Sequence, residues 1–206
     1  MIIQILVYII SATVLADIWK KDKKIIVNKN LDMFLIIFGC LLCLSLTILL
    51  NIFLPMLNDI FINTNSFTNT DLVVFITISI TSIILAPILE EIFYRYYLYE
   101  KIKSKTNIFL SVIITSIIFG IIHFYGITGL ISSIFIGIIL QVIYIYTNKL
   151  TNTIIIHAIY NLIIVILGLL TLPVNHISIS IFVGIFLVSC ITFLIILLKN
   201  LKTTKS

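Results

Sequence analysis

Seven continuous apolar runs, separated by short polar stretches, limit how this chain can fold. Each run is near the ~20 residues that an α-helix needs to cross the hydrocarbon core of a bilayer. The runs lack the regular alternation of apolar and polar residues that is typical of membrane β-barrel strands. The sequence therefore predicts an all-α, polytopic transmembrane bundle of about seven helices, at residues 2–19, 33–56, 72–98, 107–124, 127–147, 151–172 and 177–198.

The composition agrees with a membrane protein. Hydrophobic residues make up 61% of the 206 residues and charged residues only 10%, whereas soluble globular domains are ordinarily about 45–50% apolar. No long linker, low-complexity tract or internal repeat divides the chain. We therefore expect a single integral-membrane domain over residues 1–206.

The positive charges lie in alternate loops. In a soluble protein the net charge of +5 would indicate a nucleic-acid partner. Here the lysines fall in the first, third and fifth loops and in the C-terminal tail, while the loops at about 57–71, 124–127 and 173–177 contain no Lys or Arg. The positive-inside rule then predicts an N-terminus outside, a C-terminus in the cytoplasm and a multi-pass protein of the cell membrane, with no nucleic-acid partner.

Three ionisable side chains interrupt the third apolar run, at Glu90, Glu91 and Arg95. A charge near the bilayer centre costs about 2.5–3.5 kcal/mol on insertion scales, so such residues usually face a bundle interior and serve function. On a helix, Glu91 and Arg95 are four residues apart and can neutralise each other, whereas Glu90 points about 100° away and is left for chemistry. Pro87 lacks a backbone donor, which frees a carbonyl that a cavity water could satisfy.

His123, near the end of the fourth run, is predicted to lie beside Glu90. Counted from a tight turn near Thr106, Glu90 lies about 16 residues before the turn and His123 about 17 after it. In an antiparallel helix hairpin, each is then about 24–26 Å from the turn. A one-turn error would still leave the two side chains within about 6 Å of the same level.

His157 and Asn161 are four residues apart and share a face of the sixth predicted helix. His157 lies only about eight residues past Lys149, or about 12 Å into the helix, so it is expected to be shallower than Glu90. The depths agree if the hairpin around residues 101–105 projects into the cytoplasm, with the stretch after His123 partly re-entrant.

The spacing of Cys40 and Cys43 is compatible with a redox or zinc motif. No second ligand pair or βαβ pattern accompanies them, and they lie in an apolar run. We therefore interpret both as packing residues.

Three motifs in this order resemble the CPBP family, which comprises CAAX prenyl endopeptidases and bacteriocin-processing enzymes and is also called the Abi family. The motifs are Glu-Glu-x-x-x-Arg at Glu90, Glu91 and Arg95, Phe-x-x-x-His at Phe119 and His123, and His-x-x-x-Asn at His157 and Asn161. The resemblance covers about residues 72–165, which it implies to be the catalytic core of a helical intramembrane protease. The chain is shorter than longer family members and lacks one of their helices.

The resemblance also implies roles for these residues. Glu90 and His123 would activate the attacking water, and His157 with Asn161 would stabilise the oxyanion, with Glu91 and Arg95 in supporting positions. An older view of the family has Glu90, His123 and His157 bind zinc. A His₂Glu set with an open position is the pattern of catalytic zinc, so the cofactor stays undecided between none and Zn.

The sequence thus predicts an endopeptidase that cleaves a membrane-associated peptide or protein precursor. The heavy use of Ile, Asn and Lys indicates a low-GC bacterium, in which a peptide precursor is a more natural substrate than a CAAX protein. Two other functions stay open. One is a non-catalytic bacteriocin-immunity or regulatory scaffold on the same fold, and the other is a proton-coupled transporter, which also needs membrane carboxylates and histidines. The sequence does not predict the oligomeric state.

Overall fold

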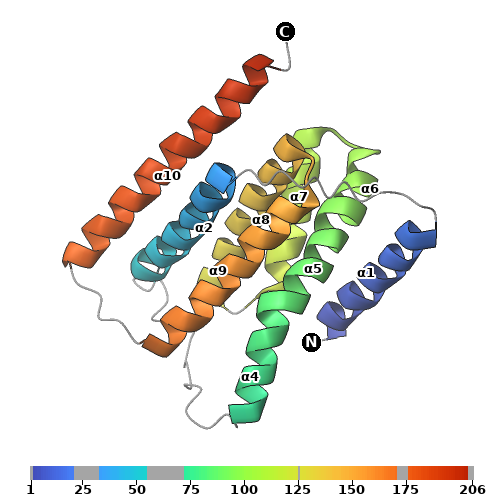
Figure 1. Cartoon of the computed structure of the whole chain (residues 1–206), viewed down its shortest axis with the longest axis horizontal. Helices are drawn as coiled ribbons and strands as arrows, with labels where there is room; N and C mark the ends of the chain where they lie inside the picture. Colours follow the sequence, from blue (N-terminus) through green and yellow to red (C-terminus); the bar gives the residue numbers. More distant parts are fainter. Residues whose placement is uncertain (1, 21–32, 55–71, 125, 171–175, 204–206) are drawn as a thin grey trace.

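The computed structural model describes residues 2–20, 33–54, 72–124, 126–170 and 176–203, and its regular elements there are helices (Figure 1). Each apolar run coincides with helix over its described residues, so the predicted all-α bundle is confirmed, and residues 55–56 and 171–172 of the predicted runs lie outside the described part. The apolar run predicted at 72–98 forms part of one continuous helical rod, Leu72–Lys103, which consists of five consecutive helical pieces. The elements are α1 (Ile2–Lys20), α2 (Met33–Phe53), α4 (Leu72–Ile80), η1 (Thr81–Leu85), α5 (Ala86–Glu91), η2 (Ile92–Leu98), α6 (Tyr99–Lys103), α7 (Ile108–Ile122), α8 (Ile127–Thr147), α9 (Leu150–Leu170) and α10 (His176–Thr203).

Polar residues between the helices explain where the chain turns. The Asn107 side chain accepts a hydrogen bond from the backbone N–H of Leu110 at 2.8 Å and caps the N-terminus of α7. The Thr106 hydroxyl donates to the carbonyl of Ile102 at 2.9 Å, which joins the end of α6 to the start of α7. The tight turn predicted near Thr106 is therefore present. Asn148 ends α8 with a φ of 51°, a left-handed conformation that asparagine tolerates.

The distribution of polarity is that of a membrane protein. Large apolar side chains such as Phe34 and Phe109, each 75% exposed, cover the outside, whereas Glu91 and Arg95 are fully buried. Among the described residues, four helices are long and apolar enough to cross a membrane. They are Met33–Phe53, Val74–Lys103, Ile127–Thr147 and Leu150–Leu167, with shorter apolar helices at Ile5–Val14, Ile108–Ile122 and Ser180–Ile196. The side of the membrane that each terminus faces stays a prediction.

The apolar core lies among α2, α8, α9 and α10 and includes Leu140, Ile143 and Ile156. Cys40 and Cys43 belong to this core and are free thiols, as the packing interpretation predicted. The Cys40 thiol lies 3.7 Å from the backbone carbonyl of Ile156 and donates to it across the α2–α9 contact.

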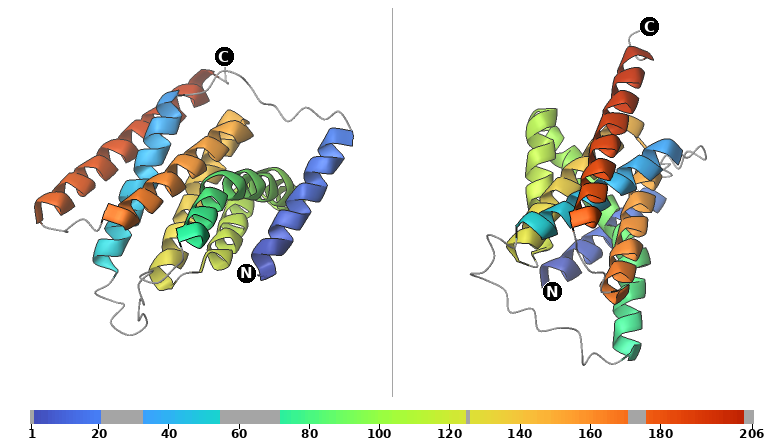
Figure 2. Two further views of the ribbon diagram at one scale, coloured as in Figure 1. Left: turned by 60° about the horizontal axis from the view of Figure 1, so that its bottom comes forward. Right: turned by 90° about the vertical axis from the view of Figure 1, so that its left-hand side faces the viewer.

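A close approach of α7 and α8 places the C-terminal end of α7 inside the bundle. A Cβ atom on Gly120 would lie 2.3 Å from Cγ1 of Ile134 and 3.1 Å from the carbonyl oxygen of Leu130. A small residue is needed where membrane helices approach this closely. Figure 2 shows α7 (yellow-green) alongside α8 (yellow), and His123, one turn after Gly120, is thereby held next to Glu90.

Candidate active site

The helix that contains Glu90 is irregular on both sides of α5, because it changes to π-helical hydrogen bonding in η1 and η2. In η1 the backbone N–H of Ala86 bonds the carbonyl of Thr81, five residues earlier. The next bond in this register would run from residue 87 to Ser82, but Pro87 has no N–H. The side-chain amide of Asn161 donates to the Ser82 carbonyl instead, at 2.7 Å. The freed carbonyl was predicted, but its partner is Asn161, whereas the sequence had indicated a water.

The Asn161 amide takes the place of the missing Pro87 N–H as the donor to Ser82, and this contact should contribute to stability. Asn161→Leu keeps the branched shape and the number of side-chain heavy atoms but leaves a half-buried carbonyl unpaired, which should cost about 1–3 kcal/mol. Adding Pro87→Ala supplies the missing backbone N–H to Ser82 and should recover most of that loss. The measurement is the unfolding midpoint of both single variants and the double variant in detergent. Strictly additive effects would contradict the link between Pro87, Ser82 and Asn161.

Glu91 and Arg95 form a buried ion pair, as their spacing predicted. Nε of Arg95 lies 2.9 Å from Oε2 of Glu91, and both side chains are fully buried. Glu91 Oε1 lies 3.1 Å from Nδ1 of His157. The guanidinium also lies 5.4 Å from the ring centre of Phe119 and donates to Gln141 at 3.4 Å. The pair therefore does more than neutralise charge, because Glu91 orients the His157 imidazole.

Phe119 lies between the two histidines. Its ring stacks on His123 at a centroid distance of 4.3 Å and meets His157 edge-on at 5.8 Å. Its backbone carbonyl oxygen lies 2.8 Å from Nδ1 of His123. Phe119 therefore fixes the plane of His123 and limits the rotation of His157.

The carboxylate of Glu90 lies close to both imidazoles. Its Oε2 atom lies 3.2 Å from Nε2 of His123 and 3.9 Å from Nε2 of His157. This oxygen is buried and accepts no hydrogen bond within the described part of the chain. The other oxygen, Oε1, accepts a hydrogen bond from the Tyr8 hydroxyl at 3.4 Å. The hairpin register thus placed Glu90 and His123 side by side correctly.

The neighbours of the two imidazoles determine where their hydrogens lie. A carbonyl oxygen only accepts, so Nδ1 of His123 carries the hydrogen that bonds Phe119. The ion-paired Glu91 carboxylate also only accepts, so Nδ1 of His157 carries a hydrogen as well. Both Nε2 atoms face Glu90, and each is the acceptor nitrogen of its ring when the imidazole is neutral. The two carboxylates and one guanidinium leave one negative charge, which a single shared proton cancels.

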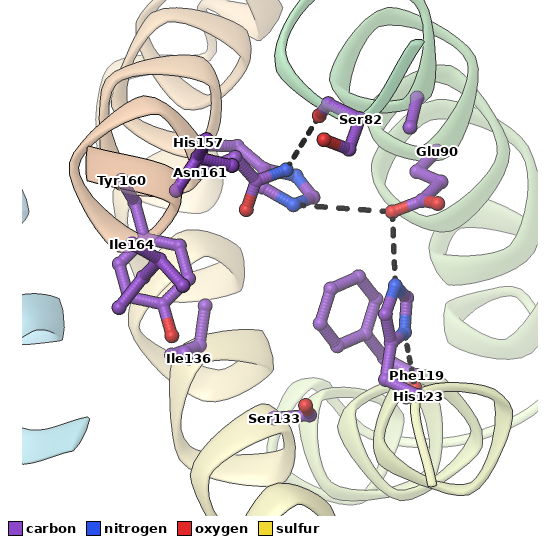
Figure 3. A pocket seen from close by; sticks show the side chains of 12 residues that line it. Ser82, Glu90, Phe119, His123, Ser133, Ile136, His157, Tyr160, Asn161 and Ile164 are labelled. Carbon is purple, nitrogen blue, oxygen red and sulfur yellow. Dashed lines mark hydrogen bonds and ion pairs between the residues drawn. The ribbon is translucent and has the colours of Figure 1, made fainter. Parts of the chain in front are cut away.

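A cavity of about 220 Å³ opens at this point (Figure 3). All four residues with a predicted direct role line it: Glu90, His123, His157 and Asn161. The supporting pair Glu91 and Arg95 is not part of the lining and lies behind it. The remaining lining residues are Ser82, Ala86, Phe119, Ser133, Ile136, Tyr160, Ile164 and Val165. The cavity therefore combines a few polar groups at one end with an apolar wall, which is the usual character of a ligand site.

The candidate site lies in a segment that is similar to a known protein family. Residues 72–163 match the family described as Type II CAAX prenyl endopeptidase Rce1-like. The segment with the candidate site is similar to this family. The resemblance predicted from the three motifs is thereby confirmed, and CAAX-type membrane proteases are the class of protein that it indicates.

A second similarity is shorter. A Bacillus subtilis (strain 168) protein named "Putative membrane peptidase YdiL" is 48% identical over 44 residues, which are 21% of this chain and 18% of that protein. The chain therefore matches less than a fifth of that relative's length. No solved structure gives a significant match.

The zinc interpretation of the Rce1-like segment receives no support from the side-chain arrangement. Within the described residues, no group of three or more His, Cys, Asp or Glu side chains is arranged to hold a metal ion. Glu90 and His123 instead lie at ion-pair distance from each other. Dependence on a cofactor, either none or Zn, stays a prediction.

Several polar residues at the site were missed by the sequence analysis. Ser82 lies five residues before Pro87, which is the π-helical spacing, so a search for acceptors freed by proline could have found it. Tyr160 follows His157 by three residues and lies on the same face of α9, where its hydroxyl is 3.1 Å from that of Thr47. Tyr8 had no signal beyond being a polar residue in an apolar run.

Proposed function

We propose that this protein is an intramembrane endopeptidase that hydrolyses a peptide bond in a membrane-associated peptide or protein precursor. The observation that supports it best is that one carboxylate and two imidazoles line the same cavity, and that one oxygen of the buried carboxylate has no hydrogen bond within the described residues. The Rce1-like match agrees with the reaction class. The proposed catalytic residues are Glu90, His123, His157 and Asn161, with Glu91 and Arg95 as supporting residues.

In this proposal Glu90 and His123 activate water. A water between Oε2 of Glu90 and the substrate carbonyl carbon gives its proton to the Glu90–His123 pair as its oxygen attacks. Proton transfer by a positioned base of this kind typically contributes ~100–10,000-fold to the rate. The pair later returns the proton to the departing amine nitrogen when the C–N bond breaks, so the products are a carboxylic acid and an amine.

His157 and Asn161 stabilise the oxyanion of the tetrahedral intermediate. Glu91 accepts the hydrogen on Nδ1 of His157, so the imidazole donates through Nε2 when it holds the shared proton. One amide hydrogen of Asn161 is used by the Ser82 carbonyl, and the second is free to donate because the amide has two. Losing one donor of an oxyanion site typically costs ~100–1,000-fold in rate.

The apolar wall of the cavity fits an extended, hydrophobic stretch of substrate. Ile136 and Ile164 lie across the cavity from Glu90, on the same side as Tyr160 and Ser133 (Figure 3), and Val165 and Phe119 also line the cavity. We propose an unlipidated peptide precursor as the substrate, on the compositional argument for a low-GC bacterium. A farnesylated peptide that the purified protein cleaves much faster than any unlipidated precursor would overturn this part of the proposal.

The test is cleavage of a pool of quenched fluorogenic membrane peptides, some of them farnesylated, by purified protein in detergent. We expect cleavage that depends on Glu90 and resists a zinc chelator. Loss of cleavage with the chelator and its return with added Zn²⁺ would show a zinc enzyme. The absence of any Glu90-dependent cleavage, combined with an intact cellular role of a Glu90→Gln strain, would replace the protease by a scaffold. Substrate flux without cleavage in proteoliposomes would indicate a transporter.

A further inference from the structure

We propose that Tyr8 is a positioning residue for Glu90, and that α1 is therefore part of the catalytic machinery. The inference rests on the proposed peptidase function for its meaning, but the contact on which it depends can be tested without activity. Tyr8 lies outside residues 72–163, the part of the chain that matches the Rce1-like family.

α1 lies against the helical rod that contains Glu90. It contacts α5 and η2, the two pieces of the rod that contain Glu90, Glu91 and Arg95. Figure 2 shows α1 along the outside of the bundle, beside this rod and away from α2 and α10. One face of α1 therefore covers the helix that contains the candidate base.

A buried hydroxyl and a buried apolar side chain hold α1 against this rod. The Ser11 hydroxyl is buried and lies 2.7 Å from two backbone carbonyl oxygens, that of Val7 in its own helix and that of Leu89, the residue before Glu90. Val7, on the same face, is buried in a cluster with Phe93 and Tyr94. In lipid, where water cannot compete, a hydroxyl-to-carbonyl hydrogen bond between helices fixes their register. Tyr8 is three residues from Ser11, so this bond also determines the level at which the Tyr8 hydroxyl meets α5.

The two carboxylate oxygens of Glu90 have different neighbours. Oε1 accepts from the Tyr8 hydroxyl at 3.4 Å, while Oε2 lies 3.2 Å from Nε2 of His123. The last torsion of a glutamate side chain has a broad and roughly two-fold preference, so a carboxylate without a second contact rotates readily. A donor on Oε1 holds the other oxygen towards the cavity. Tyr8 thereby keeps Oε2 in the orientation in which it can take a proton from water.

The experiment compares Tyr8→Phe with Tyr99→Phe. Tyr8→Phe removes only the hydroxyl, and we expect kcat on the best-cleaved peptide of the pool to fall about 10-fold, the effect of losing one hydrogen bond to a charged group. KM should change less than about two-fold, because the hydroxyl does not face the substrate. Tyr99 is buried, whereas Tyr8 is half-buried, and the Tyr99 hydroxyl has no hydrogen-bond partner within the described residues, so Tyr99→Phe should leave kcat unchanged.

Two results would overturn the inference. One is an unchanged kcat in Tyr8→Phe while Glu90→Gln is inactive. The other is a lower kcat accompanied by an equal fall in the unfolding midpoint and a changed KM, which would mean that the hydroxyl only supports packing.

A wild-type protein that cleaves nothing would contradict the proposed function, and the contact is then judged by stability alone. In that case the unfolding midpoints of Tyr8→Phe, Glu90→Gln and the double variant form a cycle. Non-additive shifts support the Tyr8–Glu90 contact, and additive shifts overturn it.

Discussion

Glu90→Gln is expected to reduce kcat by ~100–10,000-fold while the protein stays folded. Gln has nearly the same shape as Glu, so it fills the same space beside His123 and His157, but its amide cannot take a proton from water. The buried Oε2 atom of Glu90 is the acceptor that this substitution removes. The measurement is the cleavage rate of the best peptide of the pool under saturating substrate, with the unfolding midpoint recorded for the same preparation.

The matched control is Glu100→Gln. Glu100 is on the same rod, and its exposed side chain pairs with Lys103 at 3.7 Å. A surface pair of this kind contributes little, so activity and stability should both stay near those of the wild type. Equal losses in the two variants would mean that any carboxylate on this rod matters, and the assignment of Glu90 as the base would be wrong.

Local spacing predicted much of this site. The helix Ile127–Thr147 was predicted from the sequence with the same bounds that the structure shows. A continuous apolar run between polar turns has few alternatives to a helix in a membrane. Glu91 and Arg95 pair because residues four apart on a helix are neighbours. The register of Glu90 and His123 followed from counting residues on two helices joined by a short turn. Each of these inferences uses only one helix or one hairpin.

Contacts between helices that are distant in sequence could not be predicted in this way. The Glu91–His157 and Asn161–Ser82 hydrogen bonds depend on how α9 packs against α5 and η1, which no spacing within one helix determines. The same is true of Tyr8, since its level relative to Glu90 is set by Ser11 and the Leu89 carbonyl. Asn161 shows the consequence, because the sequence placed it at the site without indicating that Ser82 takes one of its hydrogens.

The depth of His157 has a simple geometric explanation. The rod ends at Lys103, which is 13 residues or about 20 Å after Glu90, whereas α9 begins at Leu150, 7 residues or about 10 Å before His157. Glu90 and His157 lie at the same level, so the α6–α7 hairpin extends about 10 Å beyond the start of α9. This offset agrees with a projecting hairpin, while the position of the hairpin relative to the membrane and the cytoplasm stays a prediction. The unequal lengths of the two elements were visible only once the end of the rod was known.

Arg95→Leu should destabilise the protein strongly, by about 3–5 kcal/mol, because it leaves the Glu91 carboxylate buried without its cation. The double variant Glu91→Leu/Arg95→Leu should be more stable than Arg95→Leu alone, since removing both partners leaves no unpaired charge. Lys103→Leu is the control. It breaks the exposed pair with Glu100 on the same rod and should change the free energy of unfolding by less than about 1 kcal/mol. Chemical unfolding in detergent measures all three variants.

Measuring the cleavage rate distinguishes two roles of the Glu91–Arg95 ion pair, which are charge neutralisation and orientation of the His157 imidazole. The double variant regains stability but loses the carboxylate that accepts the hydrogen on Nδ1 of His157, so the imidazole is no longer held in one orientation. We therefore expect the double variant to fold and still to cleave ~100-fold more slowly than the wild type, the cost of a misplaced oxyanion donor. Near-normal cleavage by the double variant would mean that Glu91 serves only to neutralise Arg95. If cleavage and stability instead fall together in every variant, the ion pair acts on folding alone and His157 needs no orienting partner.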